Sequence, residues 1–225
     1  MADHRLEVLD DADAVHRHGA ELIAEAAGAD ISERGHFALA VSGGRDPWPM
    51  FSQLEDFDLD WTQIEIFQVD ERVAPAGSDQ RNLTHLVESL SIGAQGSIRP
   101  MPVTDDDLEA AADRYAESLP DALGLAHMGI GPDGHTASLV PNDPVLDVTE
   151  KRVAVTTGEY EGVRRMTLTY PELHRVRRLL WVVTGEEKRD ALEKLLARDP
   201  SIPAARVDPG GDSLILADRA AAPEG

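Results

Sequence analysis

The sequence predicts an α/β protein with a doubly wound, mainly parallel β-sheet flanked by helices, and we expect residues 1–225 to form a single domain. Three observations favour this fold class. Short apolar segments typical of buried strands alternate along the chain with segments of helical periodicity. Several of the apolar segments run directly into turns that contain glycine. The chain is 225 residues long and 42% hydrophobic, which is enough to bury a core and too apolar for a disordered chain.

The expected elements follow from these patterns in chain order. Helices are expected over residues 15–27, 47–54, 82–90, 104–119 and 184–198. Capping boxes at Thr104 and at Thr184 mark the starts of the last two helices. Strands are expected over residues 37–41, 64–69, 125–130, 153–156, 166–169, 179–183 and 213–216. Sheets of this kind bind ligands beyond the carboxyl ends of their strands, so the polar turns after the strands are the places to search for a site.

Charge and hydropathy exclude several classes of protein. Asp and Glu number 42 against 21 Lys and Arg, and a net charge of −21 repels polyanions, so we expect no nucleic-acid partner. The longest unbroken apolar run, residues 179–183, is far shorter than the roughly 20 residues that cross a bilayer, so we expect no membrane partner. The acidic first residues lack the apolar segment of a signal peptide, and we expect a cytoplasmic protein. The acidity itself fits an ordinary solvated surface or a salt-rich environment.

Metal and thiol chemistry are also not expected. The chain has no cysteine, which excludes a thiol nucleophile and a cysteine-ligated metal. Its eight histidines show no zinc-like spacing, so we expect neither a metal nor another cofactor. No GxSxG motif occurs, and hydrolysis by a histidine-activated water fits the chain better than a serine nucleophile does.

The turn Ser42-Gly43-Gly44 follows an expected strand and precedes an expected helix. Two glycines let the backbone approach a ligand closely, and the N–H groups at a helix N-terminus bind phosphate. The turn carries neither the GxxxxGK[ST] nor the GxGxxG pattern of nucleotide-binding loops. A tight turn without a ligand explains the same three residues, so the motif alone leaves both interpretations open.

Two further segments could place arginines near this turn. Asp70-Glu71-Arg72 follows the second expected strand, where its position leaves a functional role and a simple surface ion pair equally open. Arg164 and Arg165 stand at the entrance of another strand, and guanidinium groups match phosphate oxygens well. Protection of an edge strand is the alternative role for this second pair.

The glycine-rich stretch over residues 129–139 is the richest in chemistry. It delivers Asp133 and His135 side by side in a loop at the end of a strand. Imidazole is the side chain best suited to proton transfer near neutral pH. A structural histidine is the alternative, but the position of His135 in a glycine loop favours a catalytic role.

Together these segments resemble the 6-phosphogluconolactonases of the glucosamine-6-phosphate isomerase/6-phosphogluconolactonase family. The matching pieces occur in family order between residues 37 and 196: AVSGG, QVDERVAP with Asn82 shortly after it, GIGPDGHTASLVP, RRMTLTYPEL and VVTGEEKRDAL. The resemblance implies a Rossmann-like fold shared with glucosamine-6-phosphate deaminase. It also implies metal-free hydrolysis of 6-phospho-D-glucono-1,5-lactone to 6-phosphogluconate in the oxidative pentose phosphate pathway.

The resemblance further implies a role for each matching residue. His135 resembles the family's general base, and Asp133 would orient the loop or the substrate hydroxyls. The residues expected to contact the sugar or its phosphate are Ser42, Gly43, Gly44, Arg45, Asp70, Arg72, Asn82 and Arg165. The partner would be a small sugar-phosphate lactone, bound by a monomer or a small homo-oligomer.

This chain departs from the family at two points. The family usually has the sequence SGGSTP, whereas in this chain Arg45 and Asp46 replace the serine and the threonine. The family also often has a lysine shortly before the arginine at 165, and Arg164 is the substitute that the sequence offers. Two other functions stay open: a deaminase or isomerase acting on glucosamine 6-phosphate, whose family motif DGHIAFNEP differs from DGHTASLVP here, and a non-catalytic sugar-phosphate sensor.

Overall fold

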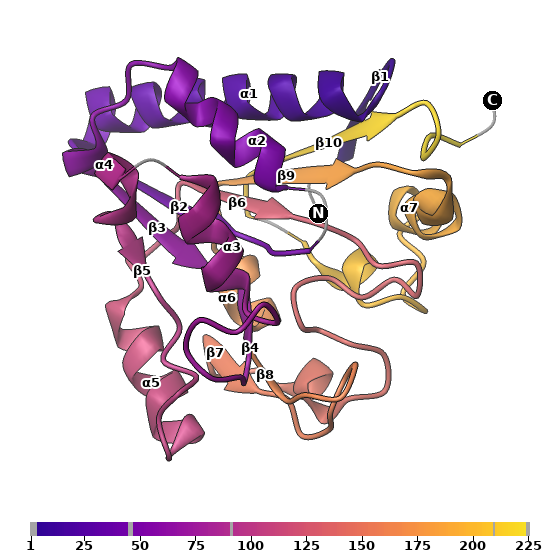
Figure 1. Ribbon diagram of the computed structural model, residues 1–225. Helices are drawn as coiled ribbons and strands as arrows, with labels where there is room; N and C mark the ends of the chain where they lie inside the picture. Colours follow the sequence, from indigo (N-terminus) through magenta and orange to yellow (C-terminus); the bar gives the residue numbers. More distant parts are fainter. Residues whose placement is uncertain (1–3, 45–46, 91, 209, 224–225) are drawn as a thin grey trace.

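The computed structural model describes residues 4–44, 47–90, 92–208 and 210–223. Its main sheet has seven strands in the order β1-β10-β9-β6-β2-β3-β5, and every neighbouring pair in it is parallel (Figure 1). The strands are β1 His4–Leu9, β2 Phe37–Val41, β3 Ile64–Gln68, β5 Ile98–Arg99, β6 Leu125–Met128, β9 Arg178–Val183 and β10 Asp212–Asp218. The predicted parallel α/β fold is therefore confirmed.

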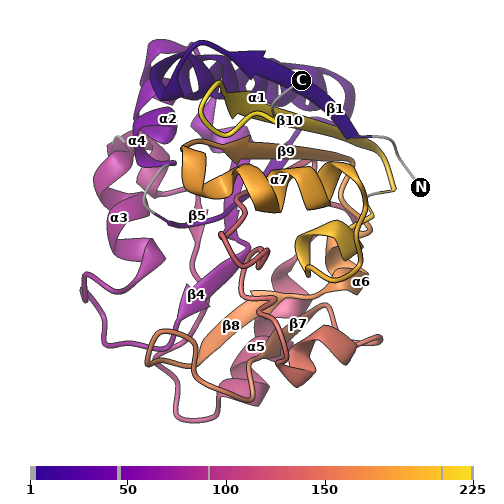
Figure 2. The same ribbon diagram turned by 90° about the vertical axis from the view of Figure 1, so that its right-hand side faces the viewer.

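A second, smaller sheet stands at the far end of the molecule from helix α1 (Figure 2). Its three antiparallel strands have the order β4-β8-β7 and cover Asp70–Arg72, Arg165–Leu168 and Val153–Val155 respectively. Two of these strands were predicted from their apolar pattern, but the pattern does not say which sheet a strand joins. The small sheet matters for function because it carries both Arg72 and Arg165.

Helices cover both faces of the main sheet because alternate strand residues point to opposite sides. Leu39 and Ile66 belong to the core under one face, and Ala40 and Phe67 belong to the core under the other. The first face is packed by α1 Ala12–Arg34, α2 Trp48–Ser52, α3 Asn82–Ser89 and α4 Ile92–Gln95. The second is packed by α5 Leu108–Ser118, α6 Tyr170–Leu173 and α7 Arg189–Leu196. Short 3-10 turns cover Gln53–Asp56, Trp61–Gln63, Pro144–Asp147, Glu186–Lys188 and Ala204–Arg206.

Three helix starts differ from the predicted ones by more than one residue. Helix α1 begins at Ala12, three residues before the predicted start, with Asp11 as its cap. Helix α5 begins at Leu108 with Asp107 as its cap, since Asp107 Oδ1 accepts a hydrogen bond from the N–H of Ala110 at 3.0 Å. The predicted start at Thr104 is therefore too early by one turn. Helix α7 begins only at Arg189, because a 3-10 turn occupies the segment after Gly185. No helix within the described ranges is long and apolar enough to span a membrane.

Candidate active site

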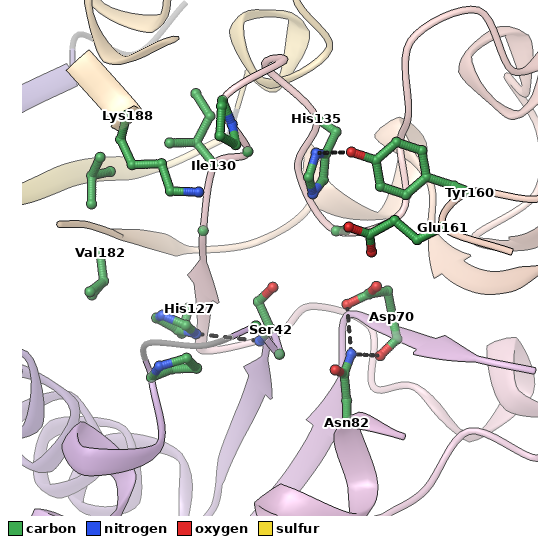
Figure 3. Close-up of a pocket in the computed structure, with 18 of the residues that line it drawn as sticks. Ser42, Asp70, Asn82, His127, Ile130, His135, Tyr160, Glu161, Val182 and Lys188 are labelled. Atoms are coloured by element: carbon green, nitrogen blue, oxygen red, sulfur yellow. Dashed lines mark hydrogen bonds between the residues drawn. The ribbon is translucent and has the colours of Figure 1, made fainter. Parts of the chain in front are cut away.

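A cavity of about 550 Å³ opens at the carboxyl edge of the main sheet, facing the small sheet (Figure 3). The segments that follow β2, β3, β6 and β9 all reach it, as the strand-end rule predicts. The sequence-predicted residues that line the cavity are Ser42, Gly43, Gly44, Asp70, Arg72, Asn82, His135 and Arg165. Asp133 lies behind His135, and Arg45 falls outside the described residues.

The loop that carries His135 folds back on itself after β6. The N–H of Gly131 donates to the carbonyl of His135 at 2.8 Å, which brings the imidazole over Gly131. A Cβ atom at residue 131 would lie 2.0 Å from His135 Nδ1, so only glycine permits this approach. Asp133 Oδ1 is 2.6 Å from His135 Nδ1 and also accepts the backbone N–H of His135 at 3.1 Å. With Nδ1 held by a carboxylate, Nε2 is the ring nitrogen left to act as a base.

Asp133 is charged at neutral pH despite its partly buried position. Burial by itself would raise the pKa of its carboxyl group, but the hydrogen bonds and charge of His135 and the hydroxyl of Tyr160 hold that pKa well below its usual range. The side chains of His135 and Asp133 are 23% and 38% exposed, so water and a small substrate can reach the pair. The pair therefore has the geometry of a carboxylate that orients a general base.

Two arginines face the cavity from the small sheet. Strands β4 and β8 are antiparallel, and their register sets Arg72 directly opposite Arg165. The Nε atoms of both side chains are buried and have no hydrogen-bond partner among the described residues. Like charges directly opposite each other destabilise a sheet, and buried unpaired donors cost free energy. The exposed carboxylate of Glu161, 2.8 Å from Arg165 Nη2, offsets part of this cost, and an anion bound between the two guanidinium groups would offset the rest.

Glu71, the middle residue of Asp70-Glu71-Arg72, has a structural role and does not face the cavity. Side chains alternate along β4, so Asp70 and Arg72 share the cavity face and Glu71 points away from it. The fully buried Glu71 carboxylate accepts the N–H groups of Asn82 at 2.7 Å and Leu83 at 2.9 Å. Glu71 thus caps α3 and fixes that helix to β4.

Asn82, the first residue of α3, connects the glycine turn to the small sheet. Its Oδ1 accepts from Arg72 Nη1 at 2.7 Å, and its Nδ2 donates to the carbonyl of Asp70 at 3.1 Å. A Cβ atom on Gly43 would lie 1.9 Å from Asn82 Oδ1, so a glycine is needed for the turn to pass this side chain. Asp70 also accepts the Ser138 hydroxyl at 2.6 Å. The network holds Asp70 and Arg72 in place before any ligand binds.

The glycine turn is anchored by a buried histidine that the sequence did not single out. The N–H of Ser42 donates to both the carbonyl and Nδ1 of His127, at 3.2 and 3.3 Å (Figure 3). Burial, with a smaller contribution from the nearby His16, lowers the pKa of His127 to about 3. His127 is therefore neutral, and its Nδ1 is available as an acceptor for the turn.

The cavity also contains residues that sequence reasoning missed. They are Pro47, His85, His127, Tyr160, Glu161, Thr184, Glu187 and Lys188. Lys188 could have been found, because it is one of only three lysines in the chain and follows the carboxyl end of β9. Tyr160 had no such signal. Arg164, the suggested replacement for a family lysine, donates from Nε to the carbonyl of Thr156 at 3.0 Å.

No group of three His, Cys, Asp or Glu side chains within the described part of the chain could hold a metal ion. The cavity instead combines His135, the side chains of Arg72, Arg165 and Lys188, and a glycine turn. On a parallel α/β sheet, these features are typical of a site for a small anionic ligand.

The chain belongs to the family described as glucosamine-6-phosphate isomerases/6-phosphogluconolactonase, whose pattern matches residues 10–216. It is 32% identical to the 6-phosphogluconolactonase of Nostoc sp. over 236 residues, which cover 97% of each protein. The crystal structure of 6-phosphogluconolactonase from Thermotoga maritima matches with a TM-score of 0.87 and 27% identity, covering 96% of this chain and 100% of that one. A monomeric glucosamine-6-phosphate deaminase shares the fold at 19% identity and a TM-score of 0.80, covering 96% and 98%.

Proposed function

We propose that this chain hydrolyses 6-phospho-D-glucono-1,5-lactone to 6-phosphogluconate, a step of the oxidative pentose phosphate pathway. One observation carries the proposal: His135, held by Asp133, lines the same cavity as the Arg72–Arg165 pair. At about 550 Å³ the cavity has the size usual for a small-molecule site. The 6-phosphogluconolactonase names of its relatives support the same activity.

In the proposed mechanism, His135 acts as the general base. Its Nε2 takes a proton from water while the water oxygen attacks the lactone carbonyl carbon. The carbon then expels the ring oxygen, and the proton held by His135 passes to that oxygen as it becomes a hydroxyl group. Asp133 keeps the imidazole oriented through Nδ1 and stabilises the positive charge that His135 carries between the two transfers.

The proposed phosphate site uses the cations of the cavity. Arg72 and Arg165 offer donors from one side, and Lys188 adds a third positive charge near the carboxyl end of β9. Gly43 and Gly44 would add backbone N–H groups, and Ser42 would add its hydroxyl group. Asp70 and Asn82 would bind the sugar hydroxyls.

We also propose the setting in which the enzyme works. A phosphorylated lactone is charged and does not cross membranes unaided, which supports a cytoplasmic enzyme. The net charge of −21 supports a protein that works without nucleic acid. The cavity lies within one chain, which supports a monomer or a small homo-oligomer whose copies each carry a complete site.

One assay tests the proposed function. The lactone is generated with glucose-6-phosphate dehydrogenase, and its disappearance is followed with and without the protein. Faster loss than spontaneous hydrolysis is the expected result. Loss at the spontaneous rate would leave a sugar-phosphate sensor, whereas ammonia release from glucosamine 6-phosphate would favour a deaminase.

A further inference from the structure

Tyr160 reaches the general base from a tight turn next to the small sheet. The N–H of Tyr160 donates to the carbonyl of Val163 at 3.0 Å, and the two residues between them, Glu161 and Gly162, both have positive φ angles of 54° and 83°. This is the pattern of a type I′ hairpin turn, in which a glutamate is unusual. Backbone strain of this kind concentrates at functional sites, and Tyr160, at the start of the turn, lines the cavity.

The hydroxyl and ring of Tyr160 both contact the catalytic pair. The hydroxyl donates to Asp133 Oδ2 at 3.0 Å and lies 3.3 Å from His135 Nδ1 (Figure 3). The aromatic ring packs on the imidazole with 5.1 Å between ring centroids. Asp133 therefore receives three donors, two from His135 and one from Tyr160, and the Tyr160 hydroxyl is the one that comes from another part of the chain.

The same residue also holds Arg165. The Arg165 guanidinium lies 4.8 Å from the centroid of the Tyr160 ring, and Arg165 Nη2 donates to the Tyr160 carbonyl at 3.3 Å and to the neighbouring Glu161 carboxylate at 2.8 Å. A cation over an aromatic face is attracted by the ring's quadrupole. Tyr160 thus touches the proposed phosphate site with one face and the proposed base with its hydroxyl and ring.

We propose that Tyr160 is a positioning residue that couples phosphate binding at Arg165 to the orientation of the Asp133–His135 pair. A phosphate that draws Arg165 into the cavity would fix the Tyr160 ring, and the fixed ring would hold Asp133 and the imidazole in the arrangement that activates water. The inference rests on the proposed function, since it assigns Arg165 to phosphate and His135 to proton transfer. It gives the enzyme a means to favour phosphorylated over unphosphorylated lactones in kcat as well as in KM.

The first test separates the hydroxyl of Tyr160 from its ring. Tyr160→Phe keeps the ring over Arg165 and removes the bond to Asp133, so kcat for the phosphorylated lactone should fall about tenfold while KM changes less than about twofold. Tyr160→Leu removes the ring as well, so KM for the phosphorylated lactone should rise about three- to fivefold in addition. KM for plain gluconolactone should not change in either variant.

Tyr170→Phe is the matched control. Tyr170 also carries a hydroxyl that donates to a backbone carbonyl, that of Pro203 at 3.0 Å, and an arginine, Arg206, 4.8 Å from its ring centroid. It lies outside the cavity, so its loss of a hydroxyl should leave kcat and KM as they are in the unmodified enzyme. A folded Tyr160→Phe protein with unchanged kcat would overturn the proposal.

A second measurement does not depend on turnover. Inorganic phosphate is added while the ring nitrogens of His135 are followed by NMR, and we expect phosphate to shift these signals in the unmodified protein and to leave them in place in Tyr160→Leu. Equal shifts in both proteins, or none in either, would overturn the coupling. Failure of the lactone assay with the unmodified protein would instead overturn the proposed function, so the two failures are distinguishable.

Discussion

Two Arg–Arg pairs stand at the entrances of two strands in this chain, and the structure gives them opposite environments. Arg177 and Arg178 precede and begin β9, and both donate to the carboxylate of Asp30, at 3.1 and 3.0 Å. Asp30 is fully buried, and Arg34 of the same helix lies 3.5 Å from it. Arg164 and Arg165 precede and begin β8; Arg165 Nη2 lies 2.8 Å from the exposed carboxylate of Glu161, and its buried Nε has no partner among the described residues.

The difference comes from the direction and the sheet of each strand. Strand β9 is parallel to its neighbours, so its first residue lies at the amino edge of the main sheet, away from the cavity. Strand β8 runs antiparallel to β4 in the small sheet, so its first residue meets Arg72 at the cavity. The arginines around the buried carboxylate stabilise the fold, whereas we propose that Arg72 and Arg165, beside the cavity, bind the substrate phosphate. Four predictions test this contrast.

The largest effect is expected at His135, the proposed general base, which lines the same cavity as Arg165. His135→Ala should lower kcat by about 10² to 10⁴, because removal of a general base costs that much. The melting temperature should change little, since the His135 side chain is 23% exposed and stands in a loop at the edge of the cavity. Lactone turnover and a melting curve on the same preparation check both parts. A folded variant with near-normal turnover would remove His135 from the mechanism.

The next effect is expected at the opposite edge of the sheet. Asp30→Asn removes the charge that binds the three arginines, and breaking a buried ion pair costs about 3–5 kcal/mol. The arginine side chains are about one-third exposed and can be rehydrated, so we expect about 2–3 kcal/mol, or a melting temperature lower by about 5–10 °C. KM should not change. A higher KM in a folded Asp30→Asn protein would show that the amino edge of the sheet also affects substrate binding, which contradicts a purely stabilising role.

A paired substitution compares the two arginine sites directly. Arg165→Ala should raise KM for the phosphorylated lactone about 10- to 100-fold, because a hydrogen bond to a charged group contributes about 1.5–3 kcal/mol. KM for gluconolactone, which lacks the phosphate, should stay nearly constant. Arg177→Ala is the matched control and should lower the melting temperature without affecting KM for either lactone. Equal losses on both substrates in Arg165→Ala would assign that arginine to structure.

The sequence was sufficient to predict the parallel fold and most of the residues that line the cavity. It was not sufficient to distinguish the two arginine pairs. Strand ends and glycine turns predict which segments meet at the carboxyl edge, and Ser42, Asp70 and His135 line the cavity there. The same rules cannot tell the pair at Arg164 from the pair at Arg177, because periodicity reports neither the sheet nor the direction of a strand. Strand β1 was missed because it is a half-exposed edge strand with charged residues.

Tyr160 was missed for a related reason. It lies in a short turn with no periodicity. Its partner Asp133 belongs to a distant segment of the sequence, and its contact with Arg165 depends on the conformation of the turn between them. A residue whose role depends on two tertiary contacts leaves no local pattern. By contrast, Asp133 and His135 are two residues apart, and their contact follows from the loop itself.

The smallest effects are expected from salt, which should act on the two arginine sites differently. The net charge of −21 makes surface carboxylates repel one another, and the screening length falls from about 30 Å at 0.01 M salt to about 3 Å at 1 M. Salt should therefore raise the melting temperature by a few degrees between 0.05 M and 2 M NaCl, while the buried contacts of Asp30 are screened little. Chloride should compete with substrate phosphate at Arg72 and Arg165, so KM for the phosphorylated lactone should rise severalfold over the same range and KM for gluconolactone should not. Melting curves and initial rates at both salt concentrations measure these changes.

A melting temperature that does not change with salt would mean that the carboxylates are already neutralised by the arginines around them. A constant KM in molar salt together with a higher melting temperature would identify the acidity as an adaptation to salt, because an ordinary acidic enzyme gains stability there but loses affinity for its phosphate.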